Sequence, residues 1–142
     1  MRQAAELGTN PDLMMVSCSG GGLAAGCAIA LAGIGQPARL AAVEPEHYDD
    51  MARSLAAGRR VCLVGRPQTI CDALLAPTPG ELTFAVNVTH HTTALAVSDA
   101  YARAAVALLF QEFRLVVEPG GAMPLAAVSY AGDRAAPDIR TE

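Results

Sequence analysis

Residues 13–26 read Leu-Met-Met-Val-Ser-Cys-Ser-Gly-Gly-Gly-Leu-Ala-Ala-Gly. The apolar run 13–16 predicts a buried strand, and the apolar residues after the glycines predict a helix. Three consecutive glycines cost backbone entropy, so the turn between strand and helix needs a specific reason. One reason is that bare backbone N–H groups at the start of a helix can close around an anion. The segment predicts a phosphate site, with a purely structural turn as the simpler alternative.

The rest of the chain alternates expected strands with expected helices. This alternation predicts an α/β fold of three layers with a mostly parallel sheet. The helix after the glycines is apolar all round and is therefore expected to be buried. The expected strands are 13–18, 39–43, 83–87, 95–97 and 115–117, and the expected helices are 22–34, 49–57, 100–113 and 122–130, with the remainder of 59–90 irregular.

Composition limits the classes of function. The chain has 142 residues and a net charge of −4, without a basic stripe, which argues against a nucleic-acid surface. We expect no membrane span, because no stretch is long and apolar enough, and no signal peptide. Four cysteines without a CxxC pair indicate reduced thiols in a cytoplasmic protein. All ten basic residues are arginine, so the chain contains no lysine.

A dinucleotide fold is one possible interpretation of the glycines. Gly20-x-Gly22-x-x-Ala25 matches the relaxed G-x-G-x-x-G/A pattern. Glu44, at the end of the second expected strand, lies about where a ribose-binding acid is required. The match is weak, since glycine-rich turns after strands are frequent, and a loop gripping the single phosphate of pyridoxal phosphate is the alternative.

Four blocks of sequence separate these alternatives. They are Ser19-Gly20-Gly21-Gly22-Leu23; 43–45 with 49–50 and 54–58; 69–74 with 79–84; and 97–99 with 115–122. In this order the blocks resemble the serine/threonine dehydratases, which are fold-type-II pyridoxal-phosphate enzymes related to serine racemase and threo-3-hydroxyaspartate dehydratase. The resemblance implies a fold like that of the tryptophan synthase β chain. It makes residues 1–131 a partial large domain and residues 132–142 a divergent, frayed tail.

The resemblance also implies site residues. Ser19, Gly20, Gly21, Gly22 and Leu23 would hold the phosphate of pyridoxal 5′-phosphate, and Glu118 would lie close to the cofactor ring. Glu44, Asp50 and the carbonyl of Tyr48 would bind Mg²⁺, Mn²⁺ or Ca²⁺, for which oxygen ligands are suited. A strand-end glutamate and an ordinary helix-starting aspartate are the plain alternative for this acidic pair.

The family reaction is β-elimination from a small hydroxy amino acid, giving a 2-oxo acid and ammonia. In the family a lysine upstream of the glycine loop forms the Schiff base and removes the Cα proton, and here that lysine is absent. A serine-bearing turn near the cofactor's pyridine nitrogen is missing as well. We therefore expect a chain truncated at both ends, without a catalytic residue of its own, inactive alone and prone to dimerise or self-associate.

Three interpretations stay open on these grounds. The first is a partial dehydratase, which the sequence does not separate from a racemase or a hydroxyaspartate dehydratase because the substrate-binding segment is absent. The second is a nicotinamide-dependent oxidoreductase domain. The third is a non-catalytic binding protein that keeps the fold without the chemistry.

Overall fold

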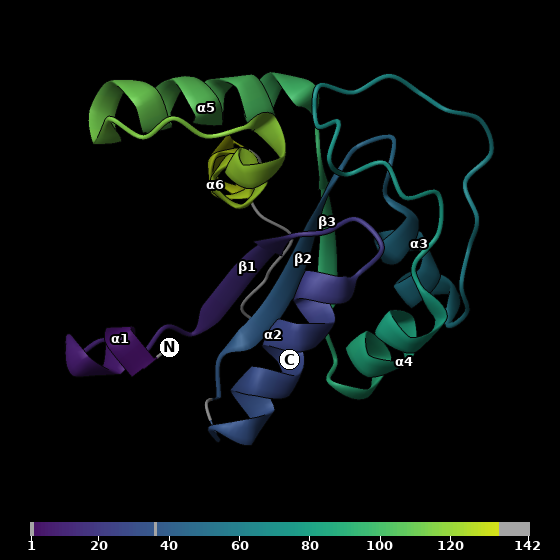
Figure 1. The fold of residues 1–142 in the computed structure, drawn as a ribbon, viewed down its shortest axis with the longest axis horizontal. Helices are drawn as coiled ribbons and strands as arrows, with labels where there is room; N and C mark the ends of the chain where they lie inside the picture. Colours follow the sequence, from purple (N-terminus) through teal and green to yellow (C-terminus); the bar gives the residue numbers. More distant parts are fainter. Residues whose placement is uncertain (1, 36, 134–142) are drawn as a thin grey trace.

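The structure is a computed structural model that describes residues 2–35 and 37–133 (Figure 1). It contains a parallel sheet and helices on both faces of that sheet. The elements are α1 (Arg2–Glu6), β1 (Leu13–Ser17), α2 (Gly22–Gly33), β2 (Arg39–Pro45), α3 (Asp50–Ala57), α4 (Glu81–Thr89), β3 (Thr93–Val97), α5 (Asp99–Phe113) and α6 (Pro119–Asp133).

The sheet has the strand order β1-β2-β3, and both pairings are parallel. Ser17 pairs with Val43, and Pro45 pairs with Val97. The carboxyl ends of the three strands therefore lie at one edge of the sheet, which is where ligands bind in open α/β folds. This confirms the expected α/β class and parallel sheet.

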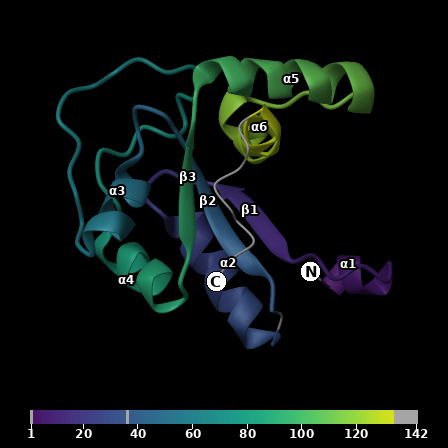
Figure 2. The same ribbon diagram turned by 180° about the vertical axis from the view of Figure 1, so that it is seen from behind.

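Side chains alternate between the two faces of each strand, as the pleat of a strand requires. Val43 belongs to a core cluster with α5 and α6, whereas its neighbour Ala42 belongs to a second cluster with α2 and α3. Met15 and Val16 divide in the same way on β1. Figures 1 and 2 show α5 and α6 together on one side of the sheet and α2 on the other.

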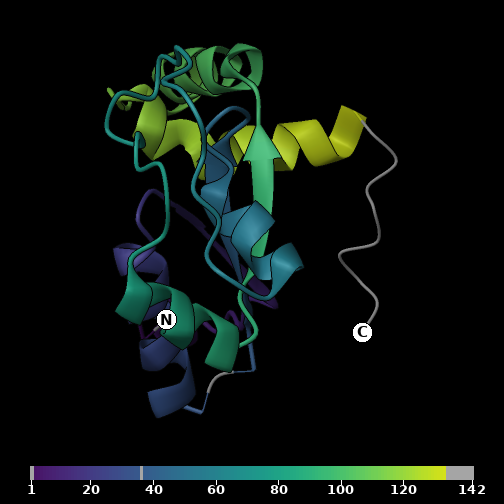
Figure 3. The same ribbon diagram turned by 90° about the vertical axis from the view of Figure 1, so that its right-hand side faces the viewer.

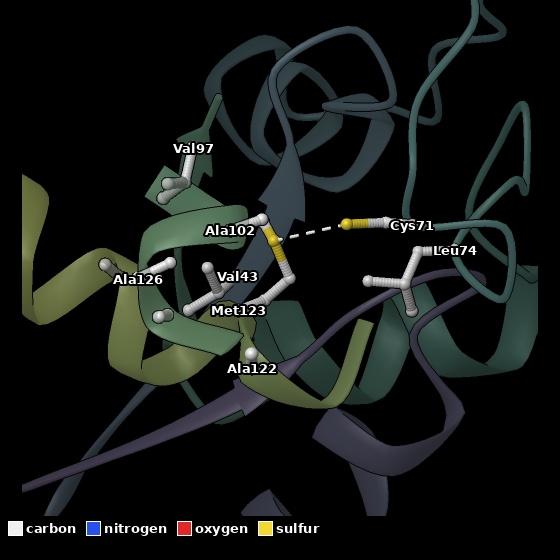
Figure 4. Packing of buried hydrophobic residues seen from close by; sticks show 10 residues of the cluster. Val43, Cys71, Leu74, Val97, Ala102, Ala122, Met123 and Ala126 are labelled. Atoms are coloured by element: carbon white, nitrogen blue, oxygen red, sulfur yellow. Dashed lines mark hydrogen bonds between the residues drawn. The ribbon is translucent and has the colours of Figure 1, made fainter. Parts of the chain in front are cut away.

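Small residues let α6 approach both the sheet and α5. Ala102 and Ala105 of α5 and Ala122 and Ala126 of α6 are all buried, and α6 runs across the strand direction in Figure 3. Met123 is fully buried at the centre of this cluster, with its sulfur 3.5 Å from the Sγ of Cys71 (Figure 4).

The expected strand 83–87 is wrong, because these residues belong to helix α4. Gly80, in an extended conformation, precedes the helix, and Glu81 lies in its first turn, where an acidic side chain is favourable. The helical period brings Thr83 and Asn87 to one face, and both donate hydrogen bonds to the glycine turn. A five-residue apolar stretch fits the side-chain period of a strand and that of a helix equally well. The tertiary contacts of Thr83 and Asn87 favour the helix here.

The expected strand 115–117 is also wrong. Residues 114–118 form an irregular connection between α5 and α6, and the side chains of Leu115 and Val116 are 52% and 90% exposed. A strand needs the backbone of a neighbour, and the sheet of the described residues places none beside this segment.

Helix α2 is less buried than its composition predicts. One face, including Ala24 and Ala28, packs in the core, whereas Leu23 and Ile29 on the other face are 63% and 54% exposed. An apolar sequence needs cover on all sides, and the described residues cover only one side of this helix.

The last helix is longer than expected, because α6 includes Gly132 and Asp133, which were assigned to the tail. Residues 134–142 of the expected tail lie outside the described residues. Among the helices of the described residues, none has the length and apolar character needed to cross a membrane.

Candidate functional site

The glycine turn joins β1 to α2 at the carboxyl edge of the sheet. Gly21 has a φ of +87°, a left-handed conformation that favours glycine. A Cβ added at Gly21 would lie 2.5 Å from the Cε of buried Met51. The N-cap residue Gly21 provides no side-chain cap for this 12-residue helix. The first N–H groups of α2, like those of any helix, have no partner within the helix.

The N-terminus of α2 borders a hollow of about 220 Å³. Its lining consists of residues 17–23 and the side chain of Leu74. A Cβ added at Gly22 would meet nothing within 4 Å, so the space beside this glycine is open. The five residues expected to bind phosphate, Ser19, Gly20, Gly21, Gly22 and Leu23, are thus brought together around one hollow.

The chain segment 76–83 contacts the turn through backbone and side-chain hydrogen bonds. The N–H of Ala76 donates to the Ser19 hydroxyl at 3.2 Å, and the N–H of Gly80 donates to the Gly20 carbonyl at 3.0 Å. The Ser19 hydroxyl accepts this bond and keeps its own hydrogen as a donor. Backbone from the third sequence block therefore fixes the backbone of the first.

Thr83 and Asn87 complete this side of the turn. The Thr83 hydroxyl donates to the Gly20 carbonyl at 2.6 Å, and the Asn87 amide donates to the Gly21 carbonyl at 3.3 Å. The sequence reasoning missed both residues because it expected a strand here. Polar residues at i and i+4 in an otherwise apolar stretch, after a Gly-Glu pair, were the available signal.

Glu44 and Asp50 are completely buried near the start of α3. The two carboxylate oxygens of Glu44 accept the N–H groups of Met51 and Ala52 at 2.8 and 2.9 Å. Glu44 therefore satisfies the first turn of α3 and is not an exposed acid that could reach a ribose. Both carboxylate oxygens of Asp50 are buried and find no hydrogen-bond partner among the described residues.

The environment shifts the pKa of both carboxyls upward. Burial raises the pKa of Glu44 to about 8, against the effect of the two N–H groups it accepts. Burial, followed by the negative charge of Asp49, raises the pKa of Asp50 to about 7. A bound cation would favour the charged form of both carboxyls and so offset the effect of burial.

Tyr48, the third expected metal ligand, is buried in the turn between β2 and α3, where its N–H donates to the Pro45 carbonyl at 2.8 Å. Within residues 2–35 and 37–133, no three His, Cys, Asp or Glu side chains gather as metal ligands do. The expected site depends on two carboxylates and one carbonyl, so it remains a prediction.

Burial raises the pKa of the Cys18 thiol to about 12, and the charges of Glu44 and Asp50 add to this rise. The Gly21 N–H opposes it by interacting with the sulfur. Cys18 directly precedes Ser19, so this thiol lies beneath the turn as a neutral, buried group.

Glu118 is exposed and lies one residue before α6. The Ser17 hydroxyl, directly before the glycine turn, donates to the Gly120 carbonyl at 2.6 Å. A Cβ added at Gly120 would lie 3.7 Å from Glu118 Oε1. The fourth sequence block thus lies against the end of β1, beside the residues that line the hollow.

Comparison with known proteins identifies the family. The model of the family described as "Pyridoxal-phosphate dependent enzyme" matches residues 2–140. The β-hydroxyaspartate dehydratase of Paracoccus denitrificans is 33% identical over 128 residues, which are 87% of this chain and 40% of that protein. The serine racemase of Oryza sativa subsp. indica is 37% identical over 116 residues, which are 82% of this chain and 34% of that protein.

The crystal structure of a threonine deaminase from T.th. superposes with a TM-score of 0.89 at 39% identity, covering 94% of this chain and 48% of that one. The chain therefore spans less than half the length of each of these relatives. These matches confirm the expected resemblance, the fold and the cofactor class, and they decide against the dinucleotide interpretation.

Proposed function

This chain belongs to the pyridoxal-phosphate dependent enzyme family, and we propose that its glycine turn holds the phosphate group of that cofactor. One observation carries the proposal: the uncapped N-terminus of α2 opens onto the hollow lined by residues 17–23. N–H groups of Gly22 and Leu23 and the partial positive charge of the helix end suit a phosphate dianion. The Ser19 hydroxyl, held by Ala76, supplies a further donor.

We propose that the complete enzyme eliminates the hydroxyl group of a small hydroxy amino acid. The named activities of the relatives, a hydroxyaspartate dehydratase and a threonine deaminase, support this class. A racemase is the runner-up, since serine racemases match equally well. When bound, pyridoxal phosphate draws electron density from the substrate and so acidifies its Cα–H bond.

The protein residues proposed for this chemistry bind and orient, and none of them transfers the Cα proton. The turn is proposed to fix the phosphate end of the cofactor, and Glu118, one residue before α6, is proposed to lie close to the cofactor ring. A lysine amine must come from outside these 142 residues, because the chain has none. The chain alone is therefore proposed to bind the cofactor without catalysing elimination.

We further propose that Glu44, Asp50 and the carbonyl of Tyr48 hold a divalent cation. The buried oxygens of Asp50 without a partner support this proposal, because a cation would offset the cost of burying them. Hard oxygen ligands favour Mg²⁺, Mn²⁺ or Ca²⁺. The cation would lie beneath the turn and stabilise the start of α3. A shift of the thermal unfolding midpoint with Mg²⁺ that is absent in Asp50→Asn supports the site, and equal shifts exclude it.

Equilibrium dialysis tests the phosphate proposal. Pyridoxal phosphate should bind the chain, inorganic phosphate should displace it, and pyridoxal without phosphate should bind much more weakly. Binding that phosphate does not displace, or equal binding of pyridoxal, contradicts the proposal. NAD serves as the control ligand for the dinucleotide interpretation and should give no thermal shift.

An activity assay tests the catalytic part. Purified chain with pyridoxal phosphate and threonine should form no 2-oxobutanoate above the rate of free pyridoxal phosphate. Turnover by the chain alone would overturn the requirement for an outside lysine. A non-catalytic cofactor-binding protein is the second candidate, favoured by the missing lysine; it predicts that no lysine-bearing polypeptide restores activity.

We also propose that the chain self-associates in the cytoplasm. The open edges of β1 and β3 and the exposed Leu23 and Ile29 of α2 support association. Sedimentation at micromolar concentration should show dimers or larger species, and a uniform monomer would contradict this.

A further inference from the structure

Helix α4 contacts the glycine turn through two side chains. Thr83 and Asn87, one helical turn apart, donate to two successive carbonyls of the turn, Gly20 and Gly21. Asn87 is fully buried, and its amide also donates to the Thr83 carbonyl at 2.8 Å. A third donor, the Gly80 N–H, reaches the same Gly20 carbonyl at 3.0 Å.

Fixing a carbonyl also fixes the N–H group of the same peptide unit. The unit is planar, and in its trans form the C=O and the following N–H point in opposite directions. No cis bond occurs among the described residues. Holding the Gly21 carbonyl toward α4 therefore turns the Gly22 N–H away from α4, and holding the Gly20 carbonyl does the same for the Gly21 N–H.

The two N–H groups meet different surroundings. The Gly21 N–H interacts with the Cys18 sulfur beneath the turn, whereas Gly22 borders open space. The Gly22 N–H then lies with the first N–H groups of α2, which the helix itself leaves without partners. Because glycine has no Cβ, the backbone of the turn can rotate more freely than that of other residues. The hydrogen bonds from α4 restrict this rotation.

We infer that Asn87 is a positioning residue for the phosphate group, because its bond to the Gly21 carbonyl orients the Gly22 N–H, and that Thr83 supports it by fixing the preceding peptide unit of Gly20. The inference rests on the proposed function, because it concerns affinity for that phosphate. The side chains touch the turn and not the ligand. Their loss should weaken phosphate binding without removing any atom from the hollow.

The test is a titration with inorganic phosphate of chains labelled with ¹⁵N, followed by amide signals. Thr83→Val and Asn87→Leu each remove a donor, keep the branching and the number of side-chain heavy atoms, and add no charge that would itself repel phosphate. Asn87→Leu should raise the dissociation constant about tenfold, the effect of roughly one hydrogen bond, and Thr83→Val should raise it by a smaller factor, because the Gly80 N–H still holds the Gly20 carbonyl. The amide signals of Gly21 and Gly22 should shift in the free variants as well, since the peptide units are released.

Two control variants separate positioning from general stability. Thr89→Val removes the same hydroxyl from the same helix, where it donates to the Ala85 carbonyl of α4 itself at 2.9 Å, and should leave the constant unchanged. Leu31→Val weakens the core near the far end of α2 and should lower stability without changing the constant. Thr83→Ser restores the hydroxyl and should restore affinity.

Each outcome has a distinct meaning. Absence of phosphate binding in the unsubstituted chain contradicts the proposed function itself. Binding in that chain with unchanged constants in Thr83→Val and Asn87→Leu overturns the positioning inference alone. An equal loss in Thr89→Val or Leu31→Val also overturns it, since the effect would then follow stability. If Asn87→Leu does not fold, the half-buried Thr83→Val and its serine rescue decide the matter.

Discussion

The Ser17 hydroxyl donates to the Gly120 carbonyl at 2.6 Å, across 103 positions of sequence. Gly120 lies four residues before Pro124 in α6, and proline has no N–H with which to satisfy that carbonyl. Ser17 supplies the missing donor. The bond joins the last residue of β1, beside the glycine turn, to the Glu-Pro-Gly-Gly-Ala segment and so connects the first and fourth sequence blocks.

Replacing Ser17 with alanine should therefore destabilise the fold. It leaves a carbonyl without a donor, which costs about 1–3 kcal/mol of unfolding free energy. Ser129→Ala is the matched control: that hydroxyl bonds to Leu125 within α6 at 3.4 Å, and its loss should be near neutral. Urea unfolding measures both, and equal effects would contradict the special role of Ser17.

Two glycines should respond to alanine with opposite signs. Gly21→Ala forces an L-residue into the left-handed region beside Met51 and should cost at least about 1–2 kcal/mol. Gly26→Ala lies within α2, where the new Cβ meets nothing within 4 Å, and should stabilise by about 0.5–1 kcal/mol. Denaturation midpoints compare them, and stabilisation by Gly21→Ala would contradict the described turn.

How far the sequence predicts this turn can be judged from the same residues. The glycines after an apolar strand predicted the turn and the start of α2, since neither depends on distant contacts. The phosphate site at this turn stays a prediction. Thr83 and Asn87 could not be identified, because their role depends on α4 packing against residues more than 60 positions away. A short stretch such as 83–87 fits the period of a strand and that of a helix. Its helical conformation depends on packing contacts that form only in the folded chain.

The segment 115–117 shows that an apolar sequence can predict a strand where the fold has none. Its apolar, β-branched character predicted a strand, yet strand formation requires a neighbour, which sequence pattern alone does not provide. The parallel order of the strands, in contrast, followed from the alternation of strands and helices, because crossovers through helices make neighbouring strands parallel.

Without a divalent cation the chain should lose stability as the pH rises. Burial raises the pKa of Glu44 from 4.5 to about 8 and that of Asp50 from 3.8 to about 7. The folded state thus binds these protons more tightly than the unfolded state, so the stabilisation is complete below about pH 4 and is lost as the pH rises through about 8. Urea unfolding in the presence of EDTA should give a lower free energy at about pH 8.5 than at about pH 5.5.

Asp50→Asn should reduce this pH dependence, and Asp72→Asn, an exposed carboxyl, controls for the loss of one charge. Added Mg²⁺ should reduce the loss of stability at high pH in the unsubstituted chain. A free energy that rises with pH across this window would show that the two carboxyls are not buried as described.

The four cysteines should react with thiol reagents in an order set by burial. Cys62 is exposed and should react first, whereas burial holds Cys18 at a pKa of about 12 and keeps it as the unreactive thiol. Burial also raises the pKa of Cys71, which contacts Met123. Peptide mapping after brief alkylation at about pH 8 measures the order. Modification of Cys18 as fast as Cys62 would contradict the packing beneath the turn.

The N-terminus of α2 and the glycine turn are proposed to hold a phosphate group. The most direct test follows every backbone amide signal during titration with pyridoxal phosphate. If the turn holds the phosphate, the amide signals of Ser19 to Ala24 should show the largest saturable shifts. Inorganic phosphate should then shift the signals of the same amides. Saturable shifts at other residues, for example at the consecutive pair Arg59 and Arg60, with the signals of the turn unchanged, would contradict a phosphate site at the turn.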